Sequence, residues 1–231
     1  MTLRTYLVVL VLVALLPVLL FSAIVLGLVA GSEREATERG LRSTSRAVAS
    51  AVDHTVDKTI GALQLLATSE LLDAGDLPAF HAMAVRALDA HHGWLSVAVV
   101  DPRGRQLLNT LRPTGSALPP PADAQTVAAV LGTRRPAVSD LLDGDLPGRA
   151  HVVVAVPVVR GGTLSGALLT ALDAEIFTRV LEGQQLPRQW EALIVDARGT
   201  ILARVPEPQR FVGRPAPPGY PGLGRQRDDV P

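Results

Sequence analysis

The chain has 231 residues, which allows one or two domains. Its 22 Lys and Arg balance its 22 Asp and Glu, and no basic stripe interleaved with aromatic residues occurs, so nucleic acid is excluded as an expected partner. It has no cysteine, which excludes disulfides, thiolate chemistry and cysteine-based metal sites. A domain without such cross-links has to fold through core packing alone.

The first segment, residues 1–31, is predicted to hold a cytoplasmic end and a transmembrane helix. From Tyr6 to Ala30 the sequence has no charged residue for 25 positions, and about 20 apolar residues suffice to cross a hydrocarbon core of ~30 Å. A secretory signal peptide is the alternative, because "GLVAGS" offers a cleavage point, but the apolar region of such peptides is only ~7–15 residues long. Arg4 flanks the short end, which predicts a cytoplasmic amino terminus and a single span, with the bulk of the chain outside the cytoplasm.

Residues 32–68 are predicted to form one long amphipathic stalk helix. Ser32 and Glu35 have the spacing of a capping box at its start. Apolar residues then recur at spacings of 7, 4, 4, 4, 3 and 3, along one face of a helix: Leu41, Val48, Val52, Val56, Ile60, Leu63 and Leu66. This face fits a core helix, and it equally fits a helix that pairs with its copy in a homodimer.

From residue 69 onward the pattern changes to shorter elements. "DLPAFHAMAVRALDAHHG" predicts a helix with Pro78 in its first turn and Gly93 after its end. "WLSVAVV" and "RQLLNTL" are joined by the turn signal "DPRG", while "HVVVAVPVV" and "TLSGALLTAL" are joined by "RGG", so two antiparallel hairpins are predicted. The long Pro-rich stretch between them contains one predicted helix near Ala124 to Leu131, and loops of this length are usually functional.

The sequence pattern of the first predicted hairpin occurs twice in the chain. "VVDPRGRQLLNT", which starts at Val99, and "IVDARGTILARV", which starts at Ile194, share a β-branched pair, an Asp, a spacer, an Arg-Gly and a second apolar stretch. Trp94 stands seven residues before the Asp of the first copy, and Trp190 stands six before that of the second. "DAEIFTRVLEGQQLP" predicts a helix that ends the first unit. The repeat therefore predicts two related modules.

The predicted fold class is α+β, with antiparallel sheets. The first module covers residues 69–189 and the second begins at residues 190–217, before a Pro/Gly-rich tail at 218–231. Only 42 residues remain from the second tryptophan to the end, so the second module is expected to be incomplete.

The long helix, the "W…VVDPRG…LLNT" hairpin, the "AVPV" strand leading into "GALL", and the second "W…IVDARG…ILAR" hairpin resemble a double Cache sensory domain. The closing "RFVGRPAP" also resembles such sensors, and the resemblance covers about Ser32 to Pro217. It implies tandem PAS-like modules on the outer side of the bacterial inner membrane, as in histidine kinases, chemoreceptors and diguanylate cyclases.

The resemblance implies a sensory input module that binds a small molecule and relays the signal through the stalk helix and the span, as the N-terminal part of a sensor histidine kinase. The second span and the output domain of the family do not occur in this sequence, so a fragment of a longer receptor, or output through a separate partner, is expected. The alternative function is an anchored scaffold or protein-interaction domain of the cell envelope without a small ligand.

Catalytic and metal motifs are weak. "GTLSG" places Ser165 fourth instead of third, so it is no nucleophile elbow. His81, His91 and His92 lack a further acidic or His partner at ligand spacing, and "DLLDGD" lacks the closing Glu of a calcium loop. The chain is therefore predicted not to be an enzyme, and no cofactor or metal is expected.

The resemblance places the ligand in the membrane-distal module, between the sheet and the loop after the first hairpin. In this sequence the position maps onto six residues: Trp94, Asn109, Thr110, Arg112, Asp140 and His151. Arg112 is expected to bind a carboxylate, Asp140 an amine, and Trp94 to supply a stacking wall. The structural alternatives are a core role for Trp94, a solvated loop charge for Arg112 and a cap for Asp140. With eight aromatic residues in all, the sequence leaves the ligand class open.

Overall fold

A computed structural model describes residues 40–121, 123–143, 149–187 and 189–217, together with residues 15, 16 and 21. The predicted transmembrane helix, the capping box of the stalk helix and the tail from residue 218 lie outside these residues. Among the residues that the structure describes, no helix is both long and apolar enough to cross a membrane. The chain forms two compact units, Met1–Ala49 and Ser50–Pro231, and the second contains all of the strands described below.

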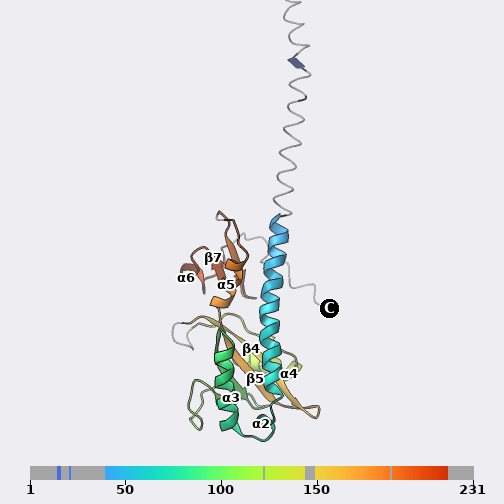
Figure 1. The fold of residues 1–231 in the computed structure, drawn as a ribbon, viewed down its shortest axis with the longest axis vertical. Helices are drawn as coiled ribbons and strands as arrows, with labels where there is room; N and C mark the ends of the chain where they lie inside the picture. The colour runs from blue at the N-terminus through green and yellow to red at the C-terminus, as the bar shows by residue number, and fades with distance from the viewer. Residues whose placement is uncertain are drawn as a thin grey trace, which may run out of the picture. The chain divides into compact units, whose positions relative to one another are not determined.

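Residues 40–67 are helical, in agreement with the predicted stalk helix (Figure 1). Thr59, Leu63 and Ala67 recur at intervals of four and are buried, with exposed fractions of 6%, 0% and 5%. This end of the helix therefore belongs to the core of the second unit. Leu41, near the other end, is 45% exposed, and the homodimer predicted for the apolar face stays a prediction.

The second unit contains a five-stranded antiparallel sheet with the order β2-β1-β5-β4-β3. Its strands are β1 (Trp94–Val100), β2 (Gln106–Asn109), β3 (Ala137–Val138), β4 (His151–Arg160) and β5 (Thr163–Asp173). Both predicted hairpins are present, since β1 pairs with β2 and β4 pairs with β5. The two-residue strand β3 was not predicted, because it is too short to show a period.

In chain order, α2 (Glu70–Asp73) and α3 (Leu77–Ala90) precede β1, α4 (Ala124–Thr133) lies between β2 and β3, and α5 (Glu175–Gly183) follows β5. The predicted helices at α3, α4 and α5 are confirmed, whereas α2 is a single turn without a sequence period. On one face of the sheet, Val127 and Val130 of α4 pack against Val100, Ala155 and Leu169. Because β4 and β5 are buried on both faces, they read as continuous apolar runs in the sequence.

The repeated hairpin forms a separate two-stranded sheet, β6 (Ala192–Val195) with β7 (Ile201–Val205). Helix α5 and the short helix α6 (Pro208–Phe211) pack on β7. The segment after α6 returns along the same strand, where the N–H of Ile201 donates to the carbonyl of Arg214 at 2.8 Å. The boundaries predicted for the two modules stay a prediction, since both sheets belong to one compact unit.

The turn of the first hairpin explains part of the repeated motif. One carboxylate oxygen of Asp101 accepts the N–H groups of Arg103 and Arg105, each at 2.9 Å, and the other accepts Nε of Arg105 at 2.8 Å. The N–H of Arg105 is the main cause that lowers the pKa of Asp101, and it outweighs burial, which acts in the opposite direction. Gly104 takes the positive φ of 78° that the turn requires.

Gly166 of β5 is expected to be indispensable for the packing of β5 on β1. Its φ is +148°, and a Cβ atom added there would lie 2.1 Å from the carbonyl oxygen of Val100. We expect Gly166→Ala to lower the free energy of unfolding by about 2 kcal/mol or more, in a urea denaturation of the full chain. Gly132→Ala in α4 is the control, because nothing lies within 4 Å of its added Cβ, and it should be neutral or stabilising by up to about 1 kcal/mol. Equal stability of the two variants would contradict this expectation.

Candidate functional site

A cavity of about 220 Å³ lies over the sheet next to α4. Residues that pair directly across strands point to the same face, and the pairs place Ser96, Ala98, Ala171 and Val153 on the face that α4 partly covers. The cavity exists because three of these four side chains are small. Its volume lies below the roughly 300–1,000 Å³ of sites for drug-sized ligands, so it suits a small metabolite.

The opposite wall of the cavity comes from the loop after β2, with Leu111, Arg112 and Pro119 to Pro121. The cavity therefore lies between the sheet and the loop that follows the first hairpin, which is the position that the resemblance implied. Three of the six predicted residues line it, namely Asn109, Arg112 and His151, and the other three do not.

Two amide side chains fasten the loop to the sheet. Asn109 donates from Nδ2 to Oε1 of Gln106 at 2.9 Å, and Gln106 donates from Nε2 to the carbonyl of Pro119 at 2.9 Å. Oδ1 of Asn109 accepts the N–H of Leu111 at 3.0 Å. These bonds hold the loop residues over the sheet, so Asn109 shapes the cavity wall. Gln106 was not predicted, because its role depends on a loop contact thirteen residues away.

Arg112 is exposed and lines the cavity. Its backbone is held on both sides, since its N–H donates to the carbonyl of Asn109 at 3.0 Å and Nε2 of His81 lies 3.2 Å from its carbonyl oxygen. No residue in the described ranges forms an ion pair with its guanidinium. A fixed backbone with an uncommitted guanidinium is suited to bidentate binding of a carboxylate.

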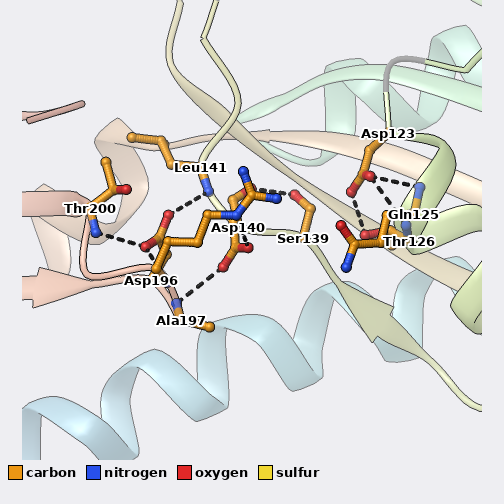
Figure 2. A network of polar contacts seen from close by, with 10 residues as sticks. Asp123, Gln125, Thr126, Ser139, Asp140, Leu141, Asp196, Ala197 and Thr200 are labelled. Atoms are coloured by element: carbon orange, nitrogen blue, oxygen red, sulfur yellow. Dashed lines mark hydrogen bonds and ion pairs between the residues drawn. The ribbon is translucent and has the colours of Figure 1, made fainter. Parts of the chain in front are cut away.

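Asp123 lies at the same cavity and is engaged as the N-cap of α4 (Figure 2). It accepts the N–H groups of Gln125 at 3.0 Å and Thr126 at 3.2 Å, and also the hydroxyl of Thr126. It adds a negative charge at the cavity wall. The sequence analysis does not predict this charge at the site, although an Asp just before a predicted helix is a standard cap signal. Across the described parts of the chain, no group of three or more His, Asp or Glu side chains could hold a metal ion.

His151 contributes a buried polar side chain, with an exposed fraction of 1%. Its Nδ1 lies 3.0 Å from the carbonyl oxygen of Arg149. A carbonyl can only accept, so Nδ1 carries the proton of the neutral ring. Nε2 is then the nitrogen that the neutral ring can offer to a ligand.

Trp94 and Thr110 have structural contacts outside the cavity. The ring of Trp94, 8% exposed, stacks on that of His91 with 4.5 Å between centroids, which matches the core alternative. The hydroxyl of Thr110 accepts the N–H of Val97 at 2.9 Å and so serves the pairing of β1 with β2.

Asp140 also lies outside this cavity, and the structure gives it a role other than the predicted amine contact. One oxygen accepts the N–H of Ala197 at 3.1 Å, and the other pairs with Nε of Arg198 at 2.8 Å. In return, Asp196 accepts the N–H of Leu141 at 3.1 Å (Figure 2). We call this reciprocal exchange of carboxylates and amides, centred on Asp140 and Asp196, the inter-hairpin latch.

The segment that carries Asp140 is also bound to the cavity strand β4. The N–H of Ser139 donates to the carbonyl of Val153 at 2.9 Å, and its hydroxyl accepts the N–H of Val153 at 2.8 Å. Leu142 and His151 exchange both of their backbone bonds, at 2.8 and 3.0 Å. Residues 137–142 therefore join two cavity residues of β4 to the turn of the second hairpin.

Comparison with family models and with curated proteins finds no match. Solved structures match in fold. The ligand-binding domain of the Pseudomonas fluorescens chemoreceptor CtaA with L-serine has a TM-score of 0.62 at 14% identity, over 79% of this chain and 77% of that chain. That of the Pseudomonas aeruginosa PAO1 chemoreceptor PctB with L-Arg has a TM-score of 0.57 at 18% identity, over 78% and 75%. The ligand-binding domain of PctC from the same organism, in complex with GABA, has a TM-score of 0.52 at 17% identity, over 74% of this chain and 75% of that chain.

The chain therefore has the fold of the ligand-binding domains of bacterial chemoreceptors, which are Cache-type sensor domains. The fold implied by the sequence resemblance is confirmed, and at these identities the likeness concerns the fold alone.

We expect the inter-hairpin latch to protect the second hairpin from local opening. Asp140→Ala should speed amide hydrogen exchange in β6 and β7 more than tenfold and leave β1 unchanged, because hydrogen bonds to a charged group contribute about 1.5–3 kcal/mol each. The matched control is Asp143→Ala, whose exposed side chain lies in the same loop. Unchanged exchange in the second hairpin of the Asp140→Ala variant would show that the latch carries no stability.

Proposed function

We propose that the chain is the sensory input module of a bacterial membrane receptor and that it binds a small carboxylate-bearing metabolite in the cavity over β1, β4 and β5. The observation that carries this proposal is the cavity itself: small side chains leave space on a sheet face, and a fastened loop with the uncommitted Arg112 guanidinium closes it. The similar folds are ligand-binding domains in complex with L-serine, L-Arg and GABA, and each of these ligands carries a carboxylate.

In this proposal, the signal leaves the cavity by two routes. The end of the stalk helix is part of the core of the second unit, through Thr59, Leu63 and Ala67. Residues 137–142 connect β4 to the second hairpin through the inter-hairpin latch. Both connections are suited to relay a shift of the sheet, and we propose a histidine kinase as the output. The chain itself is proposed to be a binding module and not an enzyme.

The proposed location is the inner membrane, with residues 32 onward outside the cytoplasm, and its support is the uncharged segment from Tyr6 to Ala30 with one basic flank. Alkaline phosphatase fused after residue 217 should therefore be active in whole cells, and a cytoplasmic reporter fused at the same point should be inactive. The matched control lacks residues 6–30 and should reverse both readouts. An inactive phosphatase together with an active cytoplasmic reporter in the intact chain would refute the location.

A thermal-shift screen of small metabolites on the full chain, purified in mild detergent, tests the proposed function. A ligand at a hundred times its Kd adds about 2.7 kcal/mol of apparent stability, which raises Tm by about 5–10 °C in a domain of this size. Arg112→Ala should abolish the shift, because it removes the partner of the carboxylate, while the Tm of the free protein stays nearly unchanged, as expected for an exposed side chain. Arg103→Ala, in the turn of the first hairpin, is the matched control and should retain the shift. A folded protein that responds to no metabolite would favour the anchored scaffold instead.

A further inference from the structure

We infer that His151 determines the specificity of this cavity, by selecting carboxylates whose other end donates a hydrogen bond. The inference rests on the proposed function and adds the class of ligand. His151 lies at one end of the cavity floor, where its side chain is buried and lines the cavity.

His151 and Arg112 lie at the same end of the sheet, on different strands. Ser96 pairs with Ala171, which pairs with Val153, and the next step on this face along β4 is His151. Arg112 follows β2 beyond Thr110, whose N–H donates to the carbonyl of Val97, so the chain there runs toward the same end of the sheet. In the strand order of the sheet, three inter-strand spacings separate β2 from β4, or about 14 Å at about 4.8 Å per spacing. Two long side chains that reach in from such positions leave room for a small molecule with a polar group at each end.

The uncharged polar groups on the floor of the cavity do not discriminate between donors and acceptors, and both oxygens of the Asp123 carboxylate are engaged at the N-terminus of α4. The amides of Gln106 and Asn109 are bonded to each other and to the loop. Thr170 pairs with Val97 and Val154, so its side chain points to the other face of the sheet, and its hydroxyl donates to the carbonyl of Ser96 at 2.8 Å. The hydroxyl of Ser96 can donate or accept, so it tolerates either kind of ligand group.

His151 differs because the protein fixes which of its ring nitrogens donates a hydrogen bond and which accepts one. The carbonyl of Arg149 holds the proton on Nδ1, so Nε2 of the neutral ring is an acceptor. The paired residue on β5, Asp173, is engaged elsewhere, by Nη1 of Arg149 at 3.2 Å and by the N–H of Glu175 at 2.9 Å. Within the described ranges no protein group bonds Nε2 of His151. Once a ligand covers Nε2, this acceptor favours a ligand hydroxyl, amide or ammonium group and rejects a second carboxylate, since a polar group buried without a matching partner is costly.

Two pairs of probes of equal shape test this inference by calorimetric titration of the full chain: L-glutamine against L-glutamate, and L-asparagine against L-aspartate. In at least one pair, the amide should bind at least about tenfold more tightly than the acid near neutral pH. His151→Asn keeps a donor at the position of Nδ1 and removes Nε2, so the preference should fall below about threefold. His151→Gln places an amide oxygen near the position of Nε2 and should retain most of the preference.

Equal binding of amide and acid by the unchanged protein, or no binding of either amide, would overturn the inference. So would a preference that persists in the His151→Asn variant. In each of these cases, a metabolite shift that depends on Arg112 would leave the proposed function standing. A folded protein with no metabolite shift at all would overturn both.

Discussion

The register of β1 on β5 and of β5 on β4 is the constraint on which the site depends. Direct pairs put Ser96, Ala171 and Val153 in one row across three strands, and Ala98, Leu169 and Ala155 in the next. A slip of one residue would turn each row to the other face. Residues of both rows line the cavity, and Val153, Ala155 and Leu169 also pack in the apolar cluster with Val127 and Val130 of α4, so this face is partly packed and partly hollow. The close approach of Gly166 to Val100 helps to hold this register, because any side chain there would force the strands apart.

The repeated turn shows how one local motif serves two purposes. In both copies, one carboxylate oxygen accepts two N–H groups of its own turn: Asp101 accepts those of Arg103 and Arg105, and Asp196 does the same in the second hairpin. The second oxygen differs. In Asp101 it pairs with the Arg105 side chain, and in Asp196 it accepts the N–H of Leu141, 55 residues away. Among the described residues, the carboxylate of the first copy is therefore bound only within its own turn, whereas that of the second copy also binds the segment beside β4.

Local features of the sequence were predictable, and contacts between distant segments were not. The hairpins follow from apolar runs and the turns "DPRG" and "RGG", and α3 follows from Pro78 in its first turn and Gly93 after its end. The choice of Asn109, Arg112 and His151 came from the family resemblance, and the structure places all three at one cavity. Asp140 was interpreted as an amine ligand because its partners are 57 and 58 residues away, beyond any spacing rule. Ser96 was missed because a cavity residue is defined by the strands beside it.

The contacts of His151 also define how a ligand could act at a distance. A ligand shifts an equilibrium only as far as it binds the two states differently, so it must contact a group that moves. The backbone of His151 exchanges two hydrogen bonds with Leu142, and the N–H of the preceding residue, Leu141, donates to Asp196. In the proposed relay, a ligand that displaces His151 strains the latch directly. A ligand held only by Arg112, across the sheet, has no such connection through residues 137–142. Selection of the ligand and transmission of its signal would then depend on the same side chain.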